Sequence, residues 1–182
     1  RYDPDPLRFV LSINMPESAD TDFSWGEFVR RNNEELVATY GNLVHRVLSF
    51  TYRNFDGKIP PPGPLGPVDE TMLNGARAAM EGVDQSLSNC RFKAAIGQAF
   101  SLAQDTNRYL DATAPWKSVK TAPQDTATAL WVSIAVINCL KVMLCPFLPF
   151  SAQRLHEFLG FDGRVEEEKW DFDAILKGVE GG

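Results

Sequence analysis

The chain has 182 residues, of which 44% are hydrophobic and 23% are charged, the balance of an ordinary soluble globular protein. This length fits one sizeable core and one or two domains. The net charge of −6 argues against a generic polyanion binder, although a local basic face can act within a Debye length of about 10 Å. Any nucleic-acid contact is therefore expected to be small and directed, with a modest salt dependence.

The three cysteines, Cys90, Cys139 and Cys145, form no CxxC pair and lie near no histidine cluster. Their number and spacing predict buried thiols in a reducing compartment, not a disulfide framework or a zinc site. The chain begins Arg-Tyr-Asp-Pro, with no initiator methionine and no apolar leader. We therefore expect it to be part of a longer protein.

Helical periodicity dominates the sequence, and strand signals are scarce. The first expected helix is short and covers Pro6 to Asn14. The next begins at Ser24, which forms a capping box with Glu27, while Phe23 and Phe28 are placed as a hydrophobic staple. Together these residues predict a firmly fixed helix start.

From that start a single amphipathic helix of roughly thirty residues is expected, about 45 Å long at 1.5 Å per residue. Asn32 interrupts its stripe, and Asp56-Gly57 with four prolines up to position 64 ends it in a stiff, exposed linker. The apolar stripe consists of Trp25, Val29, Leu36, Tyr40, Leu43, Val47 and Phe50.

Further helices are predicted over Val68 to about Leu87, about Cys90 to Asp111, about Gln124 to Leu144, and Ser151 to Leu159. Helices joined by short connections predict an all-α fold, an antiparallel helix bundle. We expect the bundle domain to cover residues 1–160. An irregular or short helical tail is expected over residues 161–182, packed on the bundle or trailing it.

The segment from Ala127 to Phe150 is nearly long enough to span a membrane, and Lys141 is its only charged residue. Ser133 and Asn138 lie inside it, and prolines break its end. A central helix buried on nearly all sides explains this pattern better than a membrane span.

Catalytic motifs are absent from the sequence: there is no Gly-rich phosphate loop, no GxSxG and no HExxH. His45 and His156 are the only histidines and lie far apart in the sequence. The acidic run Glu166-Glu167-Glu168 is interpreted as a solvated surface. No active site is expected in this chain.

The most informative polar residues lie on the expected long helix. Asn42, Arg46 and Arg53 are spaced i, i+4 and i+11, so they fall within roughly 40° of one another on the helix surface. The Arg46 fork can give paired hydrogen bonds to a base edge or a phosphate, and an asparagine amide can both donate and accept. Spacing alone nevertheless favours arginines paired with acids, and an Asn42 that satisfies a neighbouring helix end.

Trp116 follows Pro115 at the start of a new segment, where proline fixes the entry geometry. Its ring can close the core or stack on a base, which is worth about 1–3 kcal/mol, and position alone favours the core. Trp25 and Trp131 lie on apolar stripes and are expected in the core. Asn107 also lies on a stripe, so a hydrogen-bonded structural role is expected for it.

These residues lie inside five phrases that resemble methionyl-tRNA synthetases, in the order in which that family has them and over nearly the whole chain. The phrases are Tyr2-Asp-Pro-Asp-Pro-Leu-Arg8, Asp22-Phe-Ser-Trp25 with Phe28-Val-x-Arg-x-Asn, Gly41-Asn-Leu-Val-His-Arg46 with Phe55-Asp-Gly-Lys-Ile-Pro60, Asn107-Arg-Tyr-Leu-Asp-Ala-Thr-Ala-Pro-Trp-Lys117, and Pro146-Phe-Leu-Pro-Phe-Ser-Ala152 with Leu155-His-Glu-x-Leu159.

The resemblance implies the anticodon-binding helix bundle that this family carries C-terminal to a Rossmann-type catalytic domain. Asn42 and Arg46 would hydrogen-bond the first anticodon base, a cytosine. Trp116, placed by Pro115, would stack on an anticodon base, and Arg53 would make a further contact. Single-stranded loops are read in this way, by stacking splayed bases and bonding their edges.

The full-length protein would then be an ATP-dependent methionine–tRNA ligase of the cytoplasm. The HIGH-like and KMSKS signatures are absent from these residues, so this chain alone is expected to be non-catalytic and to hold no cofactor or metal. ATP and methionine would be used by the catalytic domain. The expected partners are the anticodon loop of tRNA(Met) and the chain's own upstream catalytic domain, with no membrane and no DNA.

Two alternatives remain at this point. A valyl, isoleucyl, leucyl or cysteinyl synthetase could carry a similar bundle, although the Asn-Leu-x-x-Arg and Ala-Pro-Trp combination speaks against it. A helical protein-interaction module would instead show a large exposed apolar patch and no RNA binding.

Overall fold

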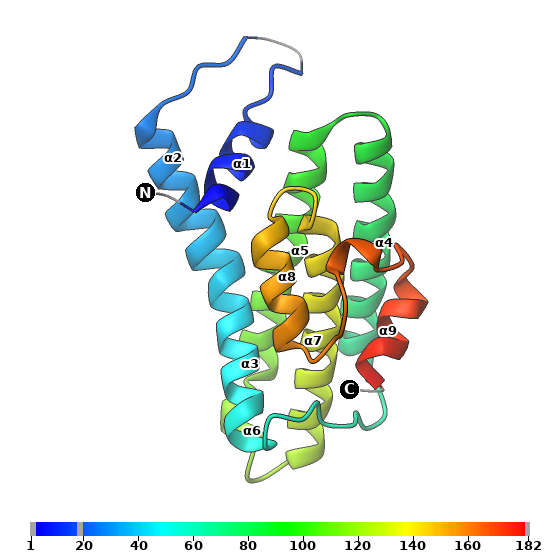
Figure 1. The fold of residues 1–182 in the computed structure, drawn as a ribbon. Helices are drawn as coiled ribbons and strands as arrows, with labels where there is room; N and C mark the ends of the chain where they lie inside the picture. The colour runs from blue at the N-terminus through cyan, green and yellow to red at the C-terminus, as the bar shows by residue number, and fades with distance from the viewer. Residues whose placement is uncertain (1–2, 18–19, 181–182) are drawn as a thin grey trace.

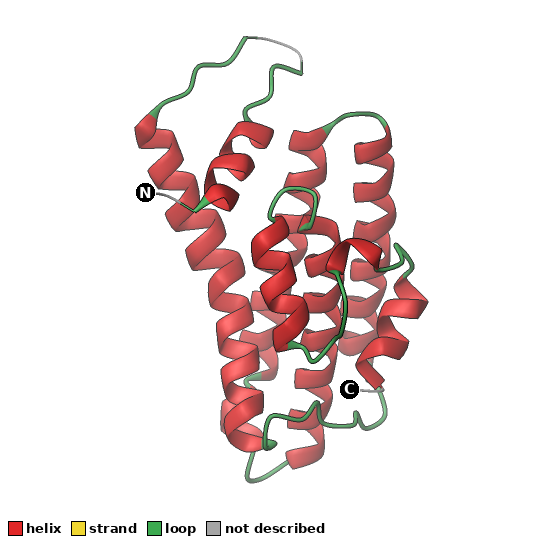
Figure 2. Ribbon diagram, in the orientation of Figure 1, coloured by secondary structure: helices red, strands yellow, loops and turns green. Residues whose placement is uncertain are grey.

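The computed structural model describes residues 3–17 and 20–180, which form a bundle of helices with no strand among them (Figures 1 and 2). This confirms the all-α prediction, and the longer helices match the expected ranges to within two residues at each end. Tyr2, and the end of the expected tail at Gly182, lie outside the described residues. In chain order the elements are α1 (Pro4–Ile13), α2 (Trp25–Arg31), η1 (Asn32–Gly41), α3 (Asn42–Asn54), α4 (Pro67–Ser88), α5 (Phe92–Thr113), α6 (Pro115–Ser118), α7 (Pro123–Leu144), α8 (Pro149–Phe158), η2 (Val165–Glu167) and α9 (Phe172–Glu180).

The long helix starts at the predicted residue, but among the described residues only one half of the predicted capping box forms. The Ser24 hydroxyl accepts a hydrogen bond from the backbone N–H of Glu27 at 3.1 Å, and the rings of Phe23 and Phe28 lie 6.4 Å apart between centroids. The Glu27 carboxylate is bound by arginines of the same helix, Arg30 among them. These contacts hold the first turn of α2 together.

A single α-helix was expected over the whole of this segment, but the long helix is not α-helical throughout. Its middle ten residues, Asn32–Gly41, form the π-helix η1, with α2 before it and α3 after it. A π-helix bonds each N–H to the carbonyl five residues earlier, so its turns are wider than those of an α-helix. The interruption of the apolar stripe at Asn32 marks the residue at which this wider segment begins.

Helix α7 is the centre of the bundle, and every residue from Thr126 to Leu144 is buried. By length and composition this helix could cross a membrane, but its most apolar stretch of 18 residues is entirely buried inside the protein. The helices α3, α4, α5, α6, α8 and α9 pack around it. The prediction of a central buried helix is therefore confirmed.

Three predictions about single residues are wrong. Trp25 is 61% exposed, because α2 packs against α1 and η1 at the end of the molecule and not against α7 (Figure 1). Cys90 is exposed, since it lies in the turn between α4 and α5 with a φ of 55°. Glu168 is not simply solvated, because its carboxylate lies 3.1 Å from Nζ of the fully buried Lys141. Burial lowers the pKa of Lys141.

The segment after residue 160 contains η2 and α9, and α9 packs against α7. Phe172, Ile175 and Val179 of α9 are buried in the same core as the bundle helices. Outside that core, Arg77 of α4 pairs with Asp173 at 2.6 Å. The tail thus contributes to the hydrophobic core, and the division at residue 160 stays a prediction.

Candidate nucleic-acid interface

Arg46 lies on the second turn of α3 and reaches across to α5. Its Nη2 donates to Oδ1 of Asp111 at 2.7 Å, and its Nη1 donates to Oδ1 of Asn107 at 3.4 Å. Asn107 and Asp111 are themselves one helical turn apart, so they present two acceptors to one guanidinium. Three of its five N–H groups have no hydrogen-bond partner among the described residues.

Asn107 has the hydrogen-bonded structural role predicted for it. Its Nδ2 donates to the backbone carbonyl of Thr39 in η1 at 3.2 Å and to that of Ala103 in α5 at 3.1 Å. Because the same amide accepts from Arg46, it also fixes the plane of the guanidinium. The apolar stripe of α5 thus predicts the role of Asn107 correctly, but not its contact with Arg46.

A sharp corner positions Trp116. Helix α5 ends at Thr113, and the cap residue Ala114 adopts the left-handed conformation with φ 42° and ψ 57°. The buried Pro115 then begins the single turn α6, and the Thr126 hydroxyl of α7 lies 3.4 Å from its carbonyl oxygen. The corner turns Trp116 outward, where the residue is 42% exposed. It is therefore not a core residue.

The Arg46 guanidinium lies over the Trp116 ring, with Cζ 5.0 Å from the ring centroid. A pocket of about 250 Å³ opens beside them and is lined also by Pro115 and Arg53. The pocket floor is apolar and consists of Val47, Phe50, Leu110 and Leu130. The structure thus brings together four of the five residues singled out from the sequence.

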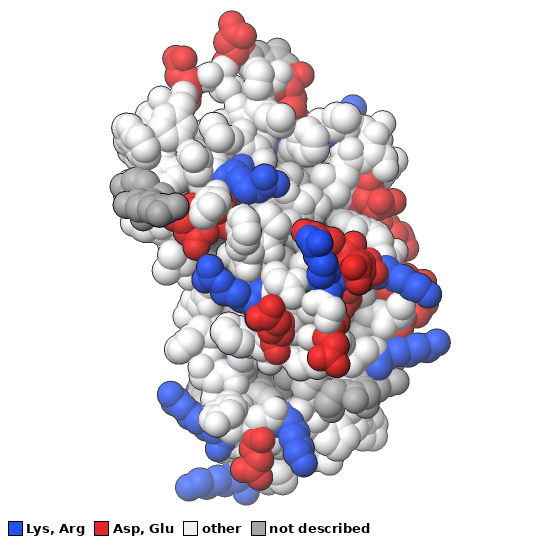
Figure 3. All heavy atoms as spheres, viewed as in Figure 1, with Lys and Arg blue, Asp and Glu red and all other residues white. Residues whose placement is uncertain are grey.

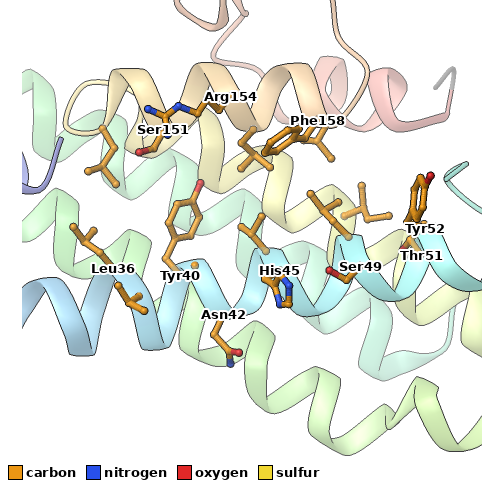
Figure 4. A pocket seen from close by; sticks show the side chains of 18 of the residues that line it. Leu36, Tyr40, Asn42, His45, Ser49, Thr51, Tyr52, Ser151, Arg154 and Phe158 are labelled. Atoms are coloured by element: carbon orange, nitrogen blue, oxygen red, sulfur yellow. The ribbon is translucent and has the colours of Figure 1, made fainter. Parts of the chain in front are cut away.

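Asn42, the fifth residue, lies outside this pocket. It is exposed on the first turn of α3, and its amide makes no hydrogen bond among the described residues. In Figure 4 its side chain points away from α8, on the opposite side of the helix from Tyr40. Asn42 is one turn before Arg46, so a bound molecule could reach both from the solvent.

A larger groove of about 1180 Å³ runs between the long helix and α8 (Figure 4). The hydroxyls of Tyr40 and Thr51 face it, and both are buried without a hydrogen-bond partner. Burial raises the pKa of Tyr40. His45 lines both the groove and the Trp116 pocket.

Asp111 is the residue that sequence analysis missed. Its signal was present, because Asn107 and Asp111 repeat the i, i+4 spacing of Asn42 and Arg46 on the facing helix. An aromatic ring, an oriented arginine fork and an exposed amide make a site suited to an unstacked base.

Among residues 3–17 and 20–180, no three His, Cys, Asp or Glu side chains are grouped to hold a metal ion.

Two family models match the chain. One is described as the anticodon binding domain of methionyl tRNA ligase and covers residues 59–182. The chain belongs to the methionyl-tRNA ligase family. The other, described as tRNA synthetases class I (M), covers residues 1–48.

Individual members of the family agree with this assignment. The chain is 52% identical to the methionine–tRNA ligase of Chloroflexus aggregans over 91% of its own length and 27% of that protein. It is 50% identical to that of Dehalococcoides mccartyi strain CBDB1 over 99% of its length and 32% of that protein. The chain therefore spans about a third or less of these methionyl-tRNA ligases.

Solved methionyl-tRNA synthetase structures share the fold. The apo form from Mycobacterium tuberculosis superposes with a TM-score of 0.86 at 26% identity, covering 94% of this chain and 34% of that one. The same enzyme in complex with methionyl-adenylate gives a TM-score of 0.84 at 27% identity, over 87% and 32%. The alternative of a valyl, isoleucyl, leucyl or cysteinyl bundle is thereby set aside.

Proposed function

We propose that this chain reads the CAU anticodon of tRNA(Met) and positions that tRNA for aminoacylation by a catalytic domain elsewhere in a cytoplasmic, ATP-dependent methionine–tRNA ligase. The chain itself supplies recognition and no chemistry. The observation that carries the proposal is the Arg46 fork, held over Trp116 at the mouth of an open pocket. Such a site combines a stacking surface with oriented donors.

The roles follow from the chemistry of cytosine. The free N–H groups of Arg46 suit the O2 and N3 acceptors of the first anticodon base, and the Asn42 amide oxygen suits its N4 donor. Trp116, placed by the buried Pro115, stacks on an anticodon base. Arg53 lines the same pocket and makes a further contact, to phosphate.

The proposal is tested by titrating the 182-residue chain with a CAU anticodon stem-loop and with loops in which the cytosine is replaced. We expect the cytosine loop to bind more tightly, and Arg46→Ala to abolish that preference. Arg77→Ala is the matched control, because Arg77 also pairs with an aspartate and lies 4.4 Å over an aromatic ring, that of Phe172. Equal binding of all loops by the unaltered chain would refute base reading.

The protein-interaction alternative has one observation in its favour. Leu7, Leu11 and Met15 of the α1 region and Val29 of α2 are each between 40% and 51% exposed. They lie within residues 1–48, the part that matches the class I synthetase model. We assign this apolar end to contact with the upstream catalytic domain. A protein-interaction role for this end is then compatible with anticodon reading at the other end.

A direct test of that contact is Leu11→Asp in a full-length ligase that carries this chain. We expect slower aminoacylation of tRNA(Met), because a charge replaces an apolar contact at a domain interface. The stem-loop affinity of the altered 182-residue chain should not change. Unaltered aminoacylation would remove the interface assignment and leave the anticodon proposal intact.

A further inference from the structure

Four exposed cationic side chains at the end of the bundle that holds the Trp116 pocket take part in none of the ion pairs found within residues 3–17 and 20–180. They are Arg53, Lys58, Lys117 and Lys120, and together they are called the basic rim. By contrast, Arg30, Arg31, Arg77, Arg108, Arg154 and Arg164 each pair with a carboxylate.

The basic rim comes from two elements that meet at one end of the bundle. Arg53 lies in the last turn of α3 and Lys58 in the turn that follows. Lys117 lies in α6, directly after Trp116, and Lys120 lies in the turn after α6. The two elements meet where Arg53 and Trp116 line the same pocket.

This end has a local charge opposite to that of the whole protein. Residues 46–62 and 111–126 together contain five cations and three acids, in a chain of net charge −6. One of those acids, Asp111, already pairs with Arg46. In Figure 3 blue groups gather at the lower end, where α3 ends and α6 lies, with a red group between them.

We infer that the basic rim binds the phosphates of single-stranded RNA whose base enters the Trp116 pocket. The inference rests on the proposed anticodon reading and extends it to the sugar–phosphate backbone on both sides of the base. Lysines bind phosphate as point charges on flexible stems, without the directional fork that reads a base. The three lysines of the rim therefore hold the loop in register and carry no sequence information.

A purely structural explanation of the same charges makes a different prediction. Cations near the carboxyl ends of α3 and α6 would stabilise those helices through the helix dipole. Their removal would then lower the stability of the protein and leave the salt dependence of RNA binding unchanged. Phosphate contact predicts the reverse, since exposed unpaired lysines contribute little to stability.

The experiment measures binding of an anticodon stem-loop at several salt concentrations to chains carrying Lys58→Gln, Lys117→Gln and Lys120→Gln, singly and combined. Lys93→Gln is the matched control: an exposed lysine outside every ion pair of the described residues, about 27 Å from Asp111 along α5 at 1.5 Å per residue. Urea unfolding of each variant separates the structural explanation from phosphate contact.

Each single change should weaken binding about two- to fivefold at 0.15 M salt and reduce the slope of log K against log salt by about 0.7. Cytosine and substituted loops should lose affinity equally, and Lys93→Gln should change neither quantity. A triple variant with an unchanged slope would overturn the inference even if cytosine discrimination persists. If discrimination is absent but the slope responds to the rim, the base-reading proposal fails and the phosphate site stands.

Discussion

Nη2 of Arg46 lies 2.7 Å from Oδ1 of Asp111, so the arginine proposed to read a base is already held by a carboxylate in the protein without RNA. The two residues are 65 positions apart in the sequence and come from facing helices, α3 and α5. A fork that is oriented before its ligand arrives loses less conformational freedom on binding.

Asp111→Ala should therefore reduce the preference for the cytosine loop, because Arg46 would keep only its longer hydrogen bond to Asn107. The same change removes a negative charge next to the RNA, so substituted loops should bind more tightly, by about two- to fivefold at low salt. Stem-loop titrations provide the measurement. Asp105→Ala, which breaks an exposed pair with Arg108 on the same helix, should leave the preference as it is.

Trp116→Ala should weaken stem-loop binding by about 1–3 kcal/mol, the worth of one base–aromatic stack, and Trp116→Phe should recover part of that loss. Because the residue is 42% exposed, its fluorescence should be quenched when the unaltered chain binds RNA. Trp25→Ala removes another exposed indole at the opposite end of the long helix. That variant should bind normally, and a comparable loss there would argue against a stacking role for Trp116.

Ala114→Gly should raise the free energy of unfolding by up to about 1 kcal/mol, since a left-handed conformation costs an L-residue about that much and glycine much less. The φ of 42° at this corner is the basis for the prediction. Ala112→Gly, two residues earlier in α5, should have the opposite sign, because glycine destabilises a helix. Urea denaturation distinguishes the two, and destabilisation by both would mean that the corner holds no strain.

Glu168→Gln should destabilise the fold by about 3 kcal/mol, because it leaves the buried ammonium of Lys141 without its carboxylate. The substituted amide can still accept a hydrogen bond from Lys141 but carries no charge, and the other contacts of Lys141, Nδ1 of His156 at 2.9 Å and the Phe161 ring, supply none. The exposed neighbour Glu167 offers the control, as Glu167→Gln should be neutral. Adding Lys141→Met to Glu168→Gln should restore part of the stability; a strictly additive pair would show that the two groups do not interact.

Cys139 should make the protein less stable at alkaline pH. Burial raises the pKa of its thiol from 9.0 to about 12, so the folded state keeps a proton that the unfolded state releases. This contribution is fully present below pH 9 and is lost as pH rises toward 12, with a slope of up to about 1.4 kcal/mol per pH unit. Urea midpoints between pH 8 and 11 should fall less steeply for Cys139→Ala, whereas the exposed Cys90→Ser should follow the unaltered chain.

The helix ranges and the shared face of Asn42 and Arg46 were predictable because both depend on local periodicity. The position of Trp116 was only partly predictable. Pro115 predicts a corner, but the outward direction of the ring comes from the left-handed conformation of Ala114. The meeting of Arg46 with Asp111 depends on how two distant helices pack, and spacing within either helix does not determine that.

The errors have a common physical origin. A stripe of apolar residues predicts which face of a helix is buried, but not how far along the helix a partner extends. Trp25 lies on the stripe and yet beyond the reach of α7. Glu168 shows the converse, since a charged residue in an acidic run lies next to a buried lysine that is 27 positions earlier. Local periodicity determines neither how far α7 extends along the long helix nor which residues of distant segments come into contact.

The π-helical segment η1 lies between the two ends of the long helix, α2 and α3, to which different contacts are assigned. Before it lie the exposed apolar residues of the end assigned to the catalytic domain, and after it lie Asn42 and Arg46. At its last residue, Gly41, a Cβ would come within 3.0 Å of the Leu36 carbonyl oxygen, so the wide turn leaves little room for a side chain. Deleting one residue of η1 to restore ordinary α-helical turns would rotate the two ends relative to each other about the helix axis. If the proposed function holds, this backbone sets the angle at which the RNA loop is presented to the catalytic domain. Insertions or deletions in η1 would then change that angle without altering any residue of the proposed RNA site.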